Sequence, residues 1–130
     1  MEKISAPLKV LYVEDDPDIQ VIARIALEDL GGFDVRACAS GEQALAAIAD
    51  FQPDLLLLDV MMPGMDGPTL LTRLRKTTNG ATVPAIFMTA RVQRSETDQY
   101  LALGATSVIA KPFDPLTLAD QIRQTLAEAP

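Results

Sequence analysis

Short apolar runs alternate with stretches of helical periodicity from one end of the chain to the other. Apolar and β-branched residues follow one another in each run, which is typical of strands buried on both faces of a sheet. These strands are predicted at residues 9–13, 33–37, 54–58, 83–88 and 106–110. Helices are predicted between and after them, at residues 18–30, 41–51, 68–76, 95–103 and 115–127.

This strict strand–helix order predicts an α/β fold of the (βα)5 type. Right-handed crossovers then give a doubly wound, five-stranded parallel sheet with helices on both faces. We expect the flavodoxin-like strand order 2-1-3-4-5, because five units are too few for an eight-stranded barrel. The 130 residues fit a single domain with a core from about residue 8 to about residue 127, and no output domain is expected after it.

Composition limits the chemistry of this domain. The chain has no histidine and one cysteine, Cys38. These counts exclude histidine-based acid–base catalysis, a Ser-His-Asp triad, Cys/His zinc sites and internal disulfides. Cys38 is interpreted as a small apolar filler. The net charge of −7 argues against a direct nucleic-acid partner.

Membrane and export signals are not seen in the sequence. The longest apolar run, residues 44–49, is far shorter than the roughly 20 residues that a membrane-spanning helix needs. Residues 1–7 show no signal-peptide pattern. We therefore expect a cytoplasmic protein without a membrane partner.

Polar residues follow four of the predicted strands. In open parallel sheets, ligands bind beyond the carboxyl ends of the strands, where the strand order reverses. The four strands are neighbours in the expected order, so their polar residues should converge. These residues are Glu14, Asp15, Asp16, Asp59, Thr89 and Lys111.

Asp59 ends a run of four leucines, where a carboxylate is costly unless something compensates it. A helix cap is a poor alternative, because Pro63 delays the next helix to about residue 68. Glu14 and Asp15 would repel Asp59 unless a cation joined them, and oxygen ligands favour Mg²⁺ or Mn²⁺. Asp16 is interpreted as the cap of the first helix.

Thr89 and Lys111 are ordinary residues when each is taken alone. Around one aspartate, however, a metal ion, an ammonium and a hydroxyl can bind the oxygens of a phosphoryl group and stabilise in-line transfer. Because the chain has no histidine or activated serine, Asp59 is the predicted nucleophile, which gives an aspartyl phosphate.

Four segments together resemble the receiver domain of two-component response regulators, the family that includes the chemotaxis regulator CheY. They are residues 10–16, 57–67, 88–90 and 111–113, in the family's order and spacing. The resemblance implies that Asp59 is the phosphoacceptor, Asp15 a direct metal ligand and Glu14 a second acid that often acts through water. It also implies that the backbone carbonyl of Met61 ligates the metal.

The resemblance assigns further roles near the last two strands. Thr89 matches the switch hydroxyl that turns onto the phosphoryl group, and Lys111 matches the lysine that pairs with it. The Lys111–Pro112 bond is expected to be cis. A histidine kinase or phosphotransfer protein is the implied donor, and the domain would catalyse its own Mg²⁺-dependent phosphorylation and dephosphorylation.

The output surface departs from the family pattern. Val108 stands where the family usually has a tyrosine or phenylalanine, and its stiff side chain cannot swing as a ring does. We therefore expect either a smaller conformational change at this position or a switch that partners detect at another position. Family partners often use the face of the fourth helix, fifth strand and fifth helix, which should here serve a downstream protein or a homodimer. It offers Arg91, Val92, Tyr100 and Val108.

Three other functions fit less well. A phosphorylation-independent interaction module on the same fold need not retain all five site residues. A haloacid dehalogenase phosphatase places its nucleophile after the first strand with an acid two residues on, where Met61 stands here relative to Asp59. A flavodoxin needs a phosphate-cradling loop after the first strand, and the acids at residues 14–16 repel phosphate.

Overall fold

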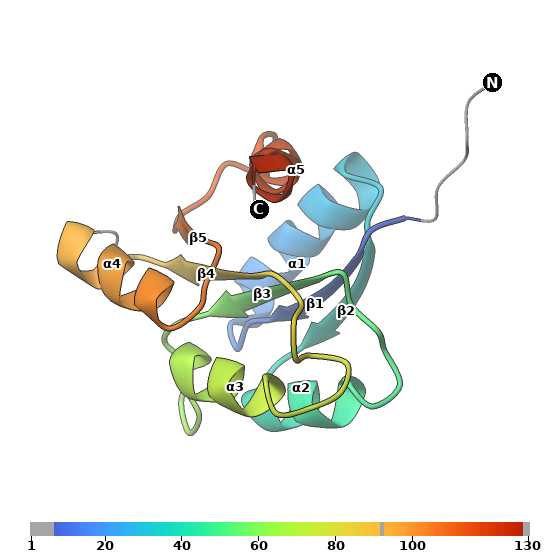
Figure 1. Cartoon of the computed structure of the whole chain (residues 1–130). Coiled ribbons are helices and arrows are strands. Elements are labelled where there is room, and N and C mark those ends of the chain that lie inside the picture. The colour runs from blue at the N-terminus through green and yellow to red at the C-terminus, as the bar shows by residue number, and fades with distance from the viewer. Residues whose placement is uncertain (1–6, 92, 129–130) are drawn as a thin grey trace.

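The computed structural model describes residues 7–91 and 93–128. Its strands form one parallel sheet in the order β2-β1-β3-β4-β5, which confirms the predicted α/β fold (Figure 1). The strands are β1 (Lys9–Val13), β2 (Asp34–Cys38), β3 (Leu55–Asp59), β4 (Ala85–Thr89) and β5 (Ser107–Ala110).

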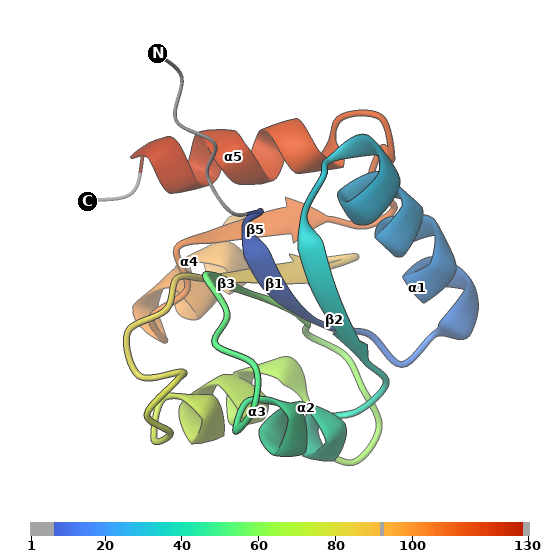
Figure 2. The ribbon, with the colours of Figure 1, turned by 90° about the vertical axis from the view of Figure 1, so that its right-hand side faces the viewer.

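Helices cover both faces of the sheet. Figures 1 and 2 show α1 and α5 on one side, α2 and α3 on the other, and α4 beside β5 at the edge. The helices are α1 (Pro17–Arg24), which continues as the π-helix η1 (Ile25–Leu30), α2 (Gly41–Ala47), α3 (Gly67–Leu74), α4 (Arg94–Ala102) and α5 (Leu118–Glu128).

Two apolar clusters hold these layers together. Side chains alternate between the faces of a strand, so Leu11 and Val13 of β1 pack toward α2 and α3. Val10 and Tyr12 of the same strand pack toward α1 and α5. Cys38 is free and buried, and burial raises the pKa of its thiol, in keeping with its interpretation as a filler.

Several predicted boundaries were wrong, for reasons that are local. The expected helix 41–51 ends at Ala47, because the next turn is tighter and Asp50 N–H donates to the Ala47 carbonyl. The last helix begins at Leu118 rather than at residue 115, because Asp114 holds a turn before it, accepting from Leu116 N–H at 2.9 Å.

The first predicted helix is continuous, but its last turns form the π-helix η1. This end packs closely against α5, since a Cβ on Gly31 would lie only 2.8 Å from the Ala119 Cβ. At its other end, Asp16 accepts from the N–H groups of Asp18 and Ile19, which confirms its prediction as the α1 cap.

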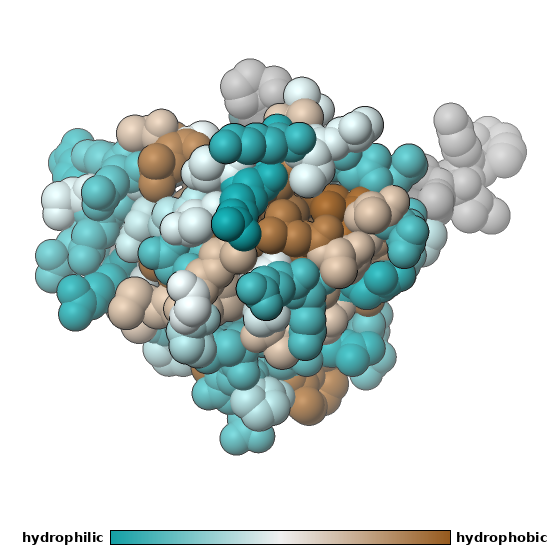
Figure 3. All heavy atoms as spheres, turned by 90° about the horizontal axis from the view of Figure 1, so that it is seen from below, coloured by the Kyte–Doolittle hydropathy of each residue, from teal (hydrophilic) through white to brown (hydrophobic). Residues whose placement is uncertain are grey.

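Within residues 7–91 and 93–128, the helices are too short or too polar to cross a bilayer. The face formed by α2 and α3 mixes hydrophilic side chains with a smaller apolar area (Figure 3).

Candidate functional site

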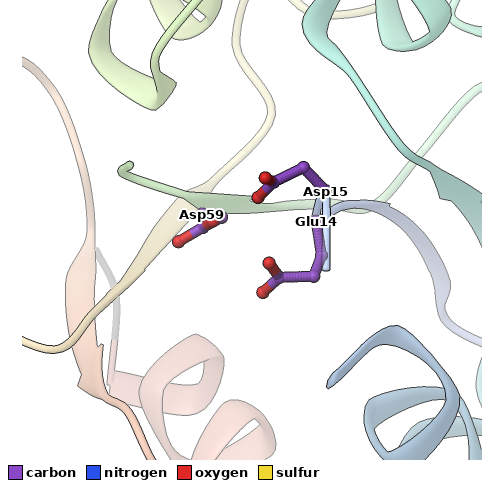
Figure 4. A group of neighbouring side chains, drawn as sticks. All are labelled: Glu14, Asp15 and Asp59. Atoms are coloured by element: carbon purple, nitrogen blue, oxygen red, sulfur yellow. The ribbon is translucent and has the colours of Figure 1, made fainter. Parts of the chain in front are cut away.

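Three carboxylates meet at the carboxyl end of the sheet. Glu14 and Asp15 follow β1, Asp59 ends β3, and one oxygen of each lies within 4.8 Å of the others. Figure 4 shows the carboxylates of Glu14 and Asp15 leaving the end of β1 in different directions and both reaching toward Asp59. Glu14 is 1% exposed and Asp59 3%, so the cluster is built into the edge of the core.

Lys111 joins this cluster from the end of β5. Its Nζ donates to Oε1 of Glu14 and to Oδ1 of Asp59, both at 3.0 Å. The Lys111–Pro112 peptide bond is cis, as predicted. The expected convergence of residues from the first, third and fifth strands is therefore confirmed.

The charges of the cluster are not balanced. Lys111 is the cation in salt-bridge contact with these carboxylates among the described residues, so two negative charges remain when all three acids are ionised. A buried excess of negative charge with oxygen-only donors is the chemistry that suits a hard divalent cation. The residues present therefore fit Mg²⁺ or Mn²⁺.

The pKa values of the buried carboxyl groups are raised, as expected for a cluster with excess negative charge. Burial raises the pKa of Glu14 to about 7; the hydrogen bond from Lys111 opposes this rise and the charge of Asp59 adds to it. Burial likewise raises the pKa of Asp59, against the hydrogen bond and charge of Lys111. Burial alone would lower the pKa of Lys111, but its bonds to Asp59 and Glu14 outweigh burial and raise it.

Thr89 ends β4 and is 2% exposed. Its Oγ1 accepts from the backbone N–H of Arg91 at 3.0 Å, which leaves the hydroxyl proton available as a donor. The Arg91 guanidinium is turned outward, 74% exposed and 3.8 Å from Oε2 of Glu96. The structure thus shows Arg91 paired with α4 rather than across the acidic cluster.

Backbone contacts fix Asp59 and Glu14 in place. A Cβ on Gly67, at the start of α3, would lie 2.4 Å from the carbonyl oxygen of Asp59, so only glycine fits there. Glu14 N–H donates to the Cys38 carbonyl at 3.0 Å. Gln20 of α1 donates to the carbonyls of both Glu14 and Cys38. The sequence reading missed Gln20, and its helical spacing on α1 gave no signal of this role.

The remaining predicted positions lie around the cluster. Met61 follows β3 and is 70% exposed. Val108 of β5 is half-buried, and Tyr100 of α4 packs edge-on against Phe87 with ring centroids 5.3 Å apart. The predicted surface residue Val92 lies outside the described residues.

Comparison with known proteins establishes the family of this chain. A family model described as the response regulator receiver domain matches residues 10–123. The chain belongs to this family. Among curated relatives of this receiver domain, the transcriptional regulatory protein CseB of Streptomyces avermitilis is 41% identical over 117 residues, which are 90% of this chain and 48% of CseB. The chain thus spans about half the length of CseB and of several other curated relatives.

Solved receiver domains have the same fold. The chemotaxis protein CheY4 of Vibrio cholerae is 30% identical with a TM-score of 0.86, covering 92% of this chain and 99% of CheY4. The receiver domain of the sensor histidine kinase PA1611 of Pseudomonas aeruginosa is 29% identical with a TM-score of 0.81, covering 95% of this chain and all of that domain. That domain was solved with a magnesium ion coordinated in its active-site cleft.

Proposed function

We propose that this receiver domain accepts a phosphoryl group on Asp59. The observation that carries the proposal is the buried pairing of Asp59 with Lys111 at 3.0 Å, inside a cluster that also holds Glu14 and Asp15. An oxygen of the Asp59 carboxylate attacks phosphorus as the bond from phosphorus to the donor nitrogen breaks, and the donor imidazole leaves with the electron pair.

The side chains around Asp59 have separate tasks in this transfer. The Lys111 ammonium binds a phosphoryl oxygen and offsets its charge. The Thr89 hydroxyl, whose proton is available, donates to a second phosphoryl oxygen. Glu14, Asp15, Asp59 and the backbone carbonyl of Met61 would hold Mg²⁺, or Mn²⁺ in its place. When bound, the ion offsets the charge that develops on the transferring group.

The partners follow from this chemistry and from the family. The donor is a histidine kinase or a histidine phosphotransfer protein, and we place the exchange in the cytoplasm. Residues 1–130 act as a single receiver domain. Arg91, Tyr100 and Val108, on the face of α4, β5 and α5, contact a downstream protein or a second copy of the chain after phosphorylation.

Intact-protein mass spectrometry tests the nucleophile. With Mg²⁺ and acetyl phosphate, the protein should gain one phosphoryl group that hydroxylamine removes. Asp59→Asn should abolish the gain, and Asp50→Asn, at an exposed position on the opposite end of the sheet, should not. Undiminished labelling of Asp59→Asn would refute the assignment. A parent protein that is never labelled, yet binds its partner, would instead support the phosphorylation-independent module.

A further inference from the structure

The Tyr12 hydroxyl is a buried polar group without a hydrogen-bond partner among the described residues. Its residue is 0% exposed and belongs to the apolar cluster beneath α1 and α5. An unpaired buried hydroxyl is destabilising, and phenylalanine would fill the same space without that cost. A tyrosine at this position therefore points to another state of the protein in which the hydroxyl is paired.

The acidic cluster lies at the end of the same face. Tyr12 lies in β1 and Glu14 follows the strand, two residues later; side chains two apart along an extended chain point to the same side. Tyr12 stands opposite Leu57 in the β1–β3 register, and Asp59 follows Leu57 by two residues. The tyrosine hydroxyl carries a proton that it can donate.

Glu14 depends on a donor that the proposed reaction draws away. Its Oε2 accepts from Asp16 N–H at 3.2 Å, and its Oε1 accepts from Lys111 at 3.0 Å. A phosphoryl group on Asp59 carries more negative charge than the carboxylate it replaces, so it attracts the Lys111 ammonium. Oε1 of the buried Glu14 then loses its hydrogen bond from Lys111.

We infer that the Tyr12 hydroxyl becomes the donor to Glu14 when the phosphoryl group engages Lys111, and that it holds the Glu14 carboxylate in place in the phosphorylated protein. This hydrogen bond pairs the Tyr12 hydroxyl and replaces the one that Glu14 loses from Lys111. Tyr12 is a positioning residue, since it acts through Glu14. The inference rests on the proposed function.

Tyr12→Phe removes only the hydroxyl, and Thr72→Val, which removes an exposed hydroxyl on α3, is its control. Beryllium fluoride with Mg²⁺ serves as a stable mimic of the phosphoryl group on Asp59. Tyr12→Phe should bind it about tenfold more weakly than the parent, the loss expected for one hydrogen bond to a charged group. The melting temperature of its resting form should equal or exceed that of the parent. Thr72→Val should keep the parent's affinity.

The hydroxyl also gives a direct spectroscopic readout. In protein labelled with ¹³C at the tyrosine Cζ, NMR should show two signals, and Tyr100→Phe assigns the one that belongs to Tyr12. The Tyr12 signal should shift when beryllium fluoride is added, because its hydroxyl gains an acceptor. A purely structural tyrosine would give the same signal in both states.

Three results would overturn the inference: an unchanged affinity of Tyr12→Phe for beryllium fluoride, an equal loss of melting temperature in the resting and loaded forms, or a Tyr12 signal that does not move. Failure of the proposed function looks different. In that case the parent itself neither binds beryllium fluoride nor takes a phosphoryl group from acetyl phosphate.

Discussion

The Nζ of Lys111 lies 3.0 Å from Oδ1 of Asp59, although 52 positions separate the two residues along the chain. The same ammonium lies 3.0 Å from Oε1 of Glu14. One cation thus serves two buried carboxylates, and Asp15 adds a third carboxylate to the cluster. The stability of the resting protein should therefore respond to any change that removes or neutralises one of these negative charges.

Asp59→Asn should stabilise the metal-free protein. The fold raises the pKa of Asp59, chiefly by burial, so it disfavours the charged form that asparagine eliminates. We expect the melting temperature to rise by about 4 °C, which corresponds to roughly 1 kcal/mol for a domain of this size. Scanning calorimetry in a chelating buffer measures the effect, with Asp50→Asn as control. A lower melting temperature for Asp59→Asn would contradict the charge-repulsion argument.

Mg²⁺ should stabilise the parent protein more than it stabilises Asp59→Asn. A ligand that binds only the folded state raises the melting temperature with its concentration, and the variant has lost one of the three carboxylates. The comparison is a titration of both proteins with MgCl₂ at constant ionic strength, followed by thermal unfolding. Equal responses of the two proteins would exclude Asp59 from the metal site.

Stability of the metal-free protein should fall as the pH rises from about 4.5 to about 7. The folded protein keeps a proton on Glu14 up to a pKa of about 7, whereas the unfolded chain loses it near the ordinary value of 4.5. Because the folded state binds more protons over this interval, raising the pH favours unfolding. Urea unfolding at a series of pH values measures the slope, and Glu14→Gln should flatten it. A slope that Glu14→Gln leaves unchanged would assign the effect to other groups.

The phosphoryl group should be long-lived, because the side chains along the path of the attacking water are poor at holding that water in place. In the family, the residues two past the acceptor and two past the threonine flank that approach, and here they are Met61 and Arg91. Methionine sulfur is a weak hydrogen-bond acceptor, and the Arg91 guanidinium is turned away from the cluster toward Glu96. Met61→Asn with Arg91→Glu should hasten hydrolysis about tenfold, or about 1.4 kcal/mol in the barrier. Phosphorus NMR follows the decay, with Arg94→Glu as a charge-matched control. A double variant no faster than the parent would disprove this account.

Phosphorylation should change amide exchange most strongly at α4 and β5. Thr89 is bonded to the backbone of Arg91, so a Thr89 hydroxyl that turns to the phosphoryl group disturbs the loop leading into α4. Tyr100, whose ring packs edge-on against Phe87, is expected to transmit the change. Exchange mass spectrometry with and without beryllium fluoride tests this, and changes confined to α2 would count against the proposed output face.

The strand order and the meeting of the site residues could be predicted because both depend on local patterns. Four leucines followed by Asp59 mark the end of a buried strand, and parallel strands bring such ends together. The boundaries were less predictable. The π-helix η1 ends at its C-cap Gly31, which packs closely against Ala119 of α5, a contact between residues distant in sequence that helical periodicity does not encode.

The ion pairs inside the site could likewise not be predicted from the sequence. The order of the strands predicts that Lys111 approaches Asp59, but not that one ammonium is shared with Glu14. Gln20 carries no motif that distinguishes it from other residues of a helix. Its role arises from the two backbone carbonyls that the packed layers place beside it.

Helix α4 has no buried residue, and Tyr100 is its partly buried apolar residue packed against the core. Substitutions elsewhere on α4 therefore cost little folding free energy, whereas those in β3 or at Gly67 disturb the sheet or the position of Asp59. Mutation can thus accumulate on α4 while the acidic cluster stays constant. Related chains can in this way come to bind different partners while they keep the phosphorylation chemistry of the acidic cluster.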